Sequence, residues 1–343
     1  MTNPTRHRLF WPAAVLVLLL ASNVFFAPRF FTITLQDGHL YGSLIDILRS
    51  ATPLALVALG MTVVIATGGI DLSLGSVMAI AGAVACLLIG DLPDQNSVGG
   101  VLVAVGVALV LSALLGVWNG VLVSVIGIQP IIATLILMVA GRGIAQLITD
   151  GQIINVSSAP FRVIGAGYLF GIPVSVIIVA VVVAASVLLV RRSALGVLIE
   201  SVGASPTASR LAGIRARGLT ITAYVFAAFC AGIAGLIFAS NVASADSNAA
   251  GNLIELDAIL AVVIGGTALT GGRFSIAGSV LGAVLISALD ITTYTIGVPA
   301  ETTLLFKAVV VVVLCLSQSA AFRAAVFRRR RTAPATPAAE VSA

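Results

Sequence analysis

The feature that most constrains this chain is a series of apolar runs, most of them long enough to cross a lipid bilayer, separated by short polar breaks. A helix needs about 20 apolar residues to cross a hydrocarbon core of about 30 Å. Of the 343 residues, 59% are hydrophobic and 9% are charged, whereas about a quarter of the residues of a soluble domain are charged. The sequence therefore predicts an all-α integral membrane protein.

Ten apolar runs are present, and each is a candidate transmembrane helix. They cover residues 11–27, 50–67, 72–90, 98–126, 129–149, 171–190, 218–240, 254–270, 275–296 and 303–321. The break between the second and third runs holds only Gly68, Gly69, Ile70 and Asp71, so these runs are either two spans or one interrupted helix. We predict about ten transmembrane helices in one membrane domain, residues 11–321.

The basic residues predict the orientation of this domain, because short cytoplasmic loops are enriched in Lys and Arg. Three groups stand before the first run, between the sixth and the seventh, and after the tenth: Arg6 and Arg8; Arg191, Arg192, Arg210, Arg215 and Arg217; Arg323 and Arg328–Arg331. Ten spans that start from a cytoplasmic N-terminus (residues 1–10) place all three groups in the cytoplasm. We therefore expect a multi-pass protein of the cell inner membrane with both termini cytoplasmic.

Two terminal segments and the overall charge fit this topology. The first run could be a signal peptide, but it continues through Phe25 and Phe26, so we expect an uncleaved first helix. Residues 322–343 are basic and rich in Ala, Pro and Thr, which predicts a disordered cytoplasmic tail. The net charge of +5 reflects the basic cytoplasmic segments, so we expect no nucleic-acid partner.

Small residues spaced four apart predict where helices pack closely, because helices in lipid associate through close backbone approach. Such spacings join Gly116 to Gly120, Gly278 to Gly282, and Ala227 to Ala231 and Gly235. They predict a helix bundle and say nothing of its function.

The segment that joins the second and third runs is the first candidate site. The glycine pair ends one helix, and Asp71 or Ser73 can cap the next helix by accepting hydrogen bonds from its free N–H groups. In that interpretation the acid is structural. In the functional interpretation an acid within the membrane lines a transport path, with Gly68, Gly69, Asp71 and Ser73 as candidate residues.

A second segment has a sequence similar to the first. Val63-Val64-Ile65 leads to Gly68-Gly69, and Val262-Val263-Ile264 leads to Gly265-Gly266. Transporters often contain repeats whose corresponding helices are broken near the pathway, although Val, Ile and Gly also recur by chance in so apolar a chain. We place Gly265, Gly266 and Thr267 among the candidate path residues.

The longest predicted cytoplasmic loop, residues 191–217, is the third candidate site. It mixes helix-forming residues with glycines at both ends, which favours a short helix across the membrane face over a solvated basic loop. Docking to a cytoplasmic partner is the preferred role. The candidate docking residues are Gly196, Glu200, Gly203, Ala208, Arg210 and Gly213.

The residues that catalysis would need are missing from the sequence. A nucleotide-binding P-loop needs a Lys after its glycines, but the only lysine is Lys307, inside the tenth run. Cys86, Cys230 and Cys315 lie in apolar runs without metal-ligand spacing, so we interpret them as small core residues. We expect a chain that is not an enzyme and that binds no metal or cofactor of its own.

Lys307, Asp290 and Glu301 lie in or beside the last two runs. We expect Lys307 to pair with an acid for structural reasons, with contact to a substrate or ion, or snorkelling to the interface, as alternatives.

From about residue 40 to residue 320, the chain resembles the ribose-type family of sugar ABC transporter permeases. The matching segments are Gly60-Met61-Thr62 through Gly68 to Ser73, Gly196 to Ile214, and Glu255 to Ala258 through Gly265-Gly266 to Gly271-Gly272. Leu35 to Gly38, Ser43 to Leu48 and Ala133 to Gly143 make it most similar to the galactofuranose-type permease subunits. It departs from the family at Leu74, where Val is usual, and at Ala204-Ser205-Pro206, where an Asn is frequent.

The resemblance implies a type II ABC importer-like permease bundle that translocates a monosaccharide, galactofuranose or a related pentose or hexose. It implies a cytoplasmic ABC ATPase that uses the ATP, a second permease subunit, homologous or identical, and a periplasmic sugar-binding protein. Residues 191–217 would be the loop that couples the permease to the ATPase.

Two other classes of membrane protein fit the sequence. An ion-coupled secondary sugar transporter would use Asp71, Asp290 or Lys307 to couple sugar to protons or sodium. A channel or structural membrane subunit is the second alternative. The dependence of uptake on ATP separates all three classes.

Overall fold

The computed structural model describes residues 10–26, 30–36, 38–297, 299, 302, 305–309, 312 and 316. Its helices are α1 (Phe10–Phe26), α2 (Ser43–Ala66), α3 (Leu74–Gly90), α4 (Val98–Val121) with a π-helical extension η2 (Leu122–Ile126), α5 (Pro130–Ile148), α6 (Ala159–Ala166), α7 (Val174–Arg192), α8 (Leu195–Ala204), α9 (Pro206–Leu211), α10 (Ala216–Val242), α11 (Ile254–Ile264) and α12 (Ile276–Ile296). The predicted tail over residues 322–343 lies outside the described residues.

Three antiparallel strand pairs lie in the loops between the helices. β1 (Thr34–Gln36) pairs with β2 (His39–Tyr41), β3 (Ile154–Asn155) with β6 (Ser244–Ala245), and β4 (Tyr168–Leu169) with β5 (Ile172–Pro173). Because each strand holds only two or three residues, the strands fasten loops and build no sheet core. The prediction of a helical membrane protein is confirmed.

Six of the described helices are long and apolar enough to cross a membrane: α2, α4 with η2, α5, α7, α10 and α12. Helix α11 has 11 residues, about 16 Å, which is about half of a bilayer core. The predicted span 254–270 is therefore only partly helical, because Gly265 and the positive φ of 83° at Gly266 end the helix. The predicted count of ten spans is not confirmed, and most of the tenth run lies outside the described residues.

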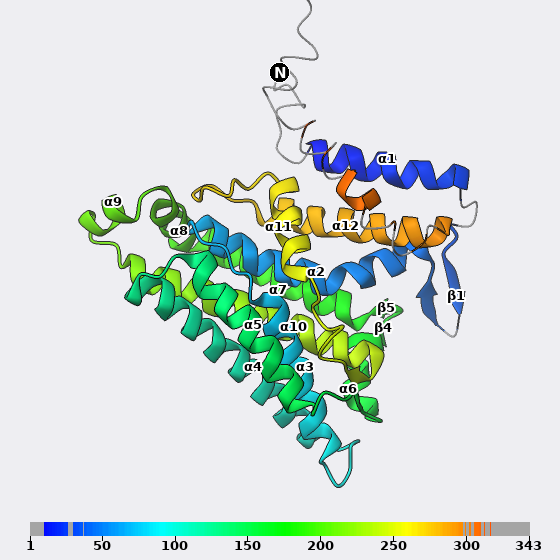
Figure 1. Cartoon of the computed structure of the whole chain (residues 1–343). Coiled ribbons are helices and arrows are strands. Elements are labelled where there is room, and N and C mark those ends of the chain that lie inside the picture. Colours follow the sequence, from blue (N-terminus) through cyan, green and yellow to red (C-terminus); the bar gives the residue numbers. More distant parts are fainter. Residues whose placement is uncertain are drawn as a thin grey trace, which may run out of the picture.

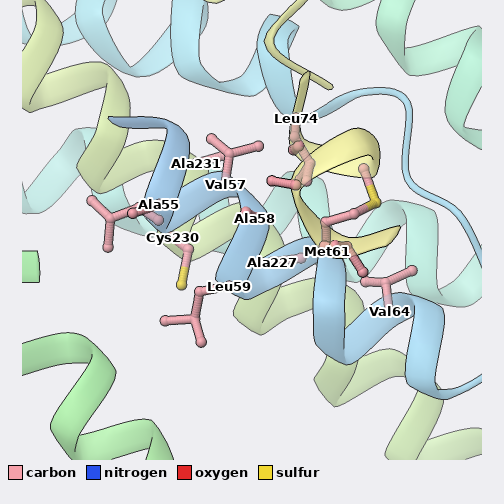
Figure 2. Close-up of a cluster of buried hydrophobic side chains, with 14 of the residues drawn as sticks. Ala55, Val57, Ala58, Leu59, Met61, Val64, Leu74, Ala227, Cys230 and Ala231 are labelled. Atoms are coloured by element: carbon pink, nitrogen blue, oxygen red, sulfur yellow. The ribbon is translucent and has the colours of Figure 1, made fainter. Parts of the chain in front are cut away.

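Helices α2 and α10 form the centre of the bundle. In the most apolar 18-residue stretch of each helix, 78% of α2 and 61% of α10 is buried inside the structure, compared with 17% of the peripheral helix α7. Figure 2 shows their contact, where Leu59 and Met61 of α2 lie near Ala227 and Cys230 of α10. A Cβ atom at Gly60 would lie 2.6 Å from the Cα of Ala227, so the two backbones touch.

The peripheral helices present large apolar side chains outward. Leu102 of α4 is 65% exposed, Val139 of α5 is 71% exposed and Val181 of α7 is 62% exposed. So much exposed apolar surface along long helices is stable against lipid or another subunit, which agrees with a multi-pass membrane protein.

The two ends of the bundle differ in structure. Helices α8 and α9 lie together at one end, which we call the coupling end after the role expected for residues 191–217, while β1, β4, β5 and α6 lie at the other (Figure 1). The C-terminus of α2 reaches the coupling end, because a Cβ atom at Gly203 of α8 would lie 1.8 Å from the Ala66 carbonyl oxygen. Helix α1 lies along α12 and is joined to it by a hydrogen bond from Asn23 Nδ2 to Thr292 Oγ1 of 2.9 Å.

The predicted small-residue contacts are confirmed. Gly116 and Gly120 of α4 contact α10, and Gly282 of α12 lies so close to α11 that an added Cβ would be 2.1 Å from the Ala261 carbonyl oxygen. At Gly235 of α10, the added Cβ would be 2.2 Å from the Met78 carbonyl oxygen of α3. These glycines allow backbones to touch where a side chain would separate them.

We expect Gly235→Val to lower the melting temperature of the detergent-solubilised protein, because overpacking at a closed helix contact costs about 1–3 kcal/mol. The matched control is Gly106→Val, since Gly106 in α4 has open space around its Cβ position. Thermal unfolding followed by tryptophan fluorescence compares the two. Equal melting temperatures would show that the α3–α10 contact adapts to the larger side chain.

Candidate functional site

The junction between α2 and α3 is a tight turn rather than a continuous helix. Helix α2 ends at Ala66, Gly68 adopts a φ of 87°, and α3 begins at Leu74. A positive φ is strained for residues with a side chain, so a glycine is favoured at position 68 in this junction. The two apolar runs therefore form two separate helices, of which only α2 is long enough to be a candidate span.

Asp71 lies in this junction and is completely buried. Its Oδ1 atom accepts hydrogen bonds from the Ser73 N–H at 2.9 Å and the Ser73 hydroxyl at 2.6 Å. Asn119 of α4 donates from Nδ2 to the same oxygen at 3.4 Å and to Ser73 Oγ at 2.8 Å. Asp71 therefore accepts a backbone N–H bond at the start of α3, as the capping interpretation of Asp71 expects, whereas Ser73 makes no side-chain capping bond.

Three buried polar atoms around Asp71 have no hydrogen-bond partner within the described part of the chain. They are Asp71 Oδ2, Asn119 Oδ1 and the hydroxyl oxygen of Tyr224 on α10. Tyr224 is fully buried, and its hydroxyl lies 2.5 Å from where a Cβ atom of Gly69 would be. A buried polar group without a partner lowers the stability of the protein. We therefore expect these three atoms to gain hydrogen-bond partners in another conformation or from a passing ligand.

Helix α5 holds the junction from the other side. The Leu72 N–H donates to Thr134 Oγ1 at 3.1 Å, and the same hydroxyl lies 3.3 Å from the Ile70 carbonyl oxygen. Asn119, Thr134 and Tyr224 were not among the predicted residues. The sequence signal that could have identified them is a polar side chain within an apolar run, because polar groups inside a membrane usually have a functional role.

The second predicted group of path residues has a different environment. Gly265 packs against the backbone of α12 at Gly278, and Thr267 Oγ1 accepts a hydrogen bond from the Ser275 N–H at 3.2 Å. Gly265, Gly266 and Thr267 therefore form the turn between α11 and α12. The role of these residues in a transport path stays a prediction.

The residues beyond this turn do meet the first candidate site. The Gly272 N–H donates to the Ala66 carbonyl oxygen at 2.9 Å, and an added Cβ at Gly271 would lie 3.0 Å from Gly68 Cα. Gly203 of α8 touches the same carbonyl and Gly272, so three backbone segments meet without intervening side chains. We call this contact of Ala66–Gly68, Gly203 and Gly271–Gly272 the glycine seam.

The predicted docking loop folds as two short helices, α8 and α9. Gly196, Ile199 and Val202 bury one face of α8, while Val197 is 69% exposed on the other. The segment thus folds as short helices with one buried face and not as a solvated loop, as the sequence predicted.

The remaining predicted docking residues shape α9 and its flanks. Ser205 caps α9 by accepting a hydrogen bond from the Ala208 N–H at 3.2 Å, and exposed Arg210 donates from Nε to the Pro206 carbonyl at 3.3 Å. Gly213, with a φ of 81°, follows the end of α9. Glu200 lies on α8, beside a hollow that the end of α7 also lines.

A cavity of about 350 Å³ connects the two predicted regions. Its lining includes Gly68 and Gly69 from the junction, Tyr224 from α10, and Arg210 from α9. Residues that the sequence assigned separately to a path and to a docking segment therefore border one space at the coupling end.

Lys307 forms the ion pair that the sequence predicted. Its Nζ atom lies 3.0 Å from Asp290 Oδ1 and 3.1 Å from Asp257 Oδ2, so it joins α11 and α12. Asp257 was not predicted as a partner, because 50 residues separate it from Lys307. Glu301, the other expected acid, lies outside the described residues.

Comparison with known proteins identifies the family. Residues 43–315 match the family described as "Branched-chain amino acid transport system / permease component". The galactofuranose transporter permease protein of Escherichia coli is 46% identical over 330 residues, which cover 94% of each chain.

The chain belongs to this permease family. The fructose import permease protein of Bifidobacterium longum is 41% identical over 91% of this chain and 87% of its own, and the ribose import permease protein of Escherichia coli is 36% identical over 88% and 90%. No solved structure matches the permease. The resemblance to sugar permeases, and to the galactofuranose type among them, is confirmed, and the relatives are transport subunits rather than enzymes.

We expect Asp71→Asn to lower the uptake rate of the assembled transporter at least tenfold while the protein still inserts and keeps its melting temperature. The amide oxygen of Asn can accept the bonds from Ser73, so the change removes the charge and keeps the turn. Asp91→Asn, in the exposed loop after α3, is the matched control. Uptake by Asp71→Asn at the control rate would show that the carboxylate has no part in transport.

We expect Gly203→Ala to uncouple the permease from its energy source, because the new methyl group would meet the Ala66 carbonyl oxygen at 1.8 Å and push α8 away. Gly203→Pro is expected to distort α8 further and have a larger effect. Gly218→Ala is the control, since its Cβ position is open. Uptake and ATP hydrolysis are measured together in liposomes. If the amount of sugar taken up per ATP is unchanged in Gly203→Ala, the seam does not couple transport to ATP hydrolysis.

Proposed function

We propose that this permease is the membrane-spanning subunit of an ATP-binding cassette importer that carries a monosaccharide across the inner membrane. Galactofuranose or a related pentose or hexose is the proposed substrate. The relatives named above are permeases for galactofuranose, fructose and ribose, and the match covers nearly the whole chain of each. The observation that carries the proposal is this full-length similarity to permeases for monosaccharides.

The segment 191–217 is proposed to dock on a cytoplasmic ATPase. Leu211 is 87% exposed and Val197 is 69% exposed, beside the basic residue Arg210. Exposed apolar side chains among charges are typical of a protein interface. ATP would be bound and hydrolysed by the partner. The proposal also has both termini in the cytoplasm and the opposite end of the bundle in the periplasm.

The glycine seam supports a mechanism of coupling. Closure of an ATPase pair would displace α8, and the Ala66 carbonyl and Gly272 would move with it because no flexible side chain separates them from Gly203. Movement of Ala66 changes the Gly68–Asp71 turn, where buried polar atoms lack partners. The docking segment and the candidate path would then change conformation together, as alternating access requires.

Two further partners complete the proposal. A second permease subunit, homologous or identical, would cover part of the exposed apolar surface of the bundle, and a periplasmic sugar-binding protein would deliver the substrate at the end opposite α8 and α9. Both follow from the class of the relatives.

Affinity purification of the tagged permease in mild detergent, with mass spectrometry of what accompanies it, tests the proposal. We expect a P-loop ATPase to copurify, and a second permease beside it if the subunits differ. The reconstituted complex should then take up sugar with ATP and stop when the P-loop Lys of the ATPase is replaced. Uptake driven by a proton or sodium gradient without an ATPase would instead establish the ion-coupled alternative.

A further inference from the structure

A second cavity, of about 460 Å³, lies between α2, α10 and the segment that leads into α11. We call it the outer cavity. Its polar lining residues include Asp46, Arg49, Ser175, Asn241, Asn252 and Asp257. None of them belongs to the predicted path or docking residues, and ligand sites usually have volumes of about 300–1,000 Å³.

The outer cavity contains hydrogen-bonding groups that are not used up within the protein. Arg49 donates from Nη2 to Asn241 Oδ1, but its Nε atom is buried without a partner among the described residues. The Ser175 hydroxyl is also buried and without a partner there, and Ser175 is 0% exposed. Buried donors without partners are costly, so a polar occupant of the cavity would stabilise both groups.

The chemistry of the lining fits an uncharged polyol. Asp46 and Asp257 provide acceptors, Arg49 provides donors, and the amides of Asn241 and Asn252 provide both. Each hydroxyl of a sugar donates one hydrogen bond and accepts others, so such a mixture satisfies it. Phe238 and Ile254 add apolar wall for the carbon face of the ring. An anionic ligand would instead face two carboxylates and one guanidinium.

The outer cavity lies next to the buried junction but is closed from it. Gly251 and Met78 line the cavity, and an added Cβ at Gly251 would lie 2.4 Å from the Gly75 carbonyl oxygen in the first turn of α3. Gly75 follows the Asp71–Ser73 group by two residues. The contact between Gly75 and Gly251 therefore separates the cavity from the network at Asp71.

Helix α5 holds this closed contact in place. Arg142 donates from Nη1 to the carbonyl oxygens of Ser247 at 2.8 Å and Ala250 at 2.6 Å, and from Nη2 to that of Gly251 at 3.2 Å. A side chain with three bonds to one loop keeps that loop against α3, so a movement of α5 or α3 would open or close the contact.

We propose that the outer cavity binds the monosaccharide before it reaches the Asp71 junction, and that the Gly75–Gly251 contact closes the inner side of this site. The inference rests on the proposed function, since it assigns a binding site to the sugar of that importer. Asp257 also holds Lys307 at 3.1 Å, so occupation of the cavity is linked to the ion pair between α11 and α12.

The test uses the purified complete transporter in lipid nanodiscs. The cysteine Asn252→Cys is placed in a permease whose native cysteines are replaced by alanine, and its reaction with a small methanethiosulfonate reagent is timed with and without sugar. The probes are D-galactose, D-fructose and D-ribose. Asn155→Cys is the control, because Asn155 is exposed in β3 and outside the cavity lining.

We expect the transported sugar to slow labelling of Asn252→Cys at least fivefold and to leave Asn155→Cys unchanged. Sugar concentrations that support transport but give no protection would overturn the outer-cavity site. Equal slowing at both cysteines would also count against it, since that indicates a global change.

A second measurement separates this inference from the proposed function. We expect Ser175→Ala and Asn252→Ala, each with an unchanged melting temperature, to reduce ATP-driven uptake at least fivefold while the binding protein keeps its affinity for sugar. Uptake at the rate of Asn155→Ala would overturn the cavity site and leave the importer intact. Failure of the unmodified transporter to import any sugar with ATP would overturn the proposed function itself.

Discussion

The proposed coupling in this permease depends on the contact of three backbone segments at the coupling end. The Ala66 carbonyl at the C-terminus of α2 has no partner within its helix and receives the Gly272 N–H at 2.9 Å. Gly203 lies so close to the same carbonyl oxygen that even a methyl side chain would not fit between them. Side chains change rotamer and absorb small displacements, whereas touching backbones transmit them. Helix α8, the proposed docking element, is thereby connected directly to the turn that carries Asp71.

The buried acid at that turn gives this connection a functional consequence. Asp71 uses one oxygen for Ser73 and Asn119, while its second oxygen and the Tyr224 hydroxyl lack partners in the described part of the chain. Such a group is poorly satisfied in this conformation, so a moderate rearrangement can improve its bonds. An element with two arrangements of similar energy is what a switch between outward and inward states needs.

The membrane class and the folding of residues 191–217 into short helices were predictable because they depend on local patterns. Apolar runs of helical length and basic residues between them determine the spans and the α8–α9 segment. The half-length α11 was predicted as a span, because periodicity cannot show that Gly265 and Gly266 interrupt an apolar run. The partner of Lys307 across 50 residues and the cavity between α2, α10 and α11 depend on tertiary packing. No short-range pattern contains that information.

The most direct test of the central claim is a pair of distances measured by pulsed electron paramagnetic resonance in the assembled transporter. Spin labels at the exposed positions Ala204 at the end of α8 and Leu269 in the loop after α11 report the rigidity of the seam, and labels at Ala204 and Phe170 report movement across the bundle. The account predicts that trapping the ATP-bound state leaves the Ala204–Leu269 distance unchanged and shifts the Ala204–Phe170 distance. A shift of the Ala204–Leu269 distance instead would show that the seam separates during the cycle and does not transmit the motion of α8.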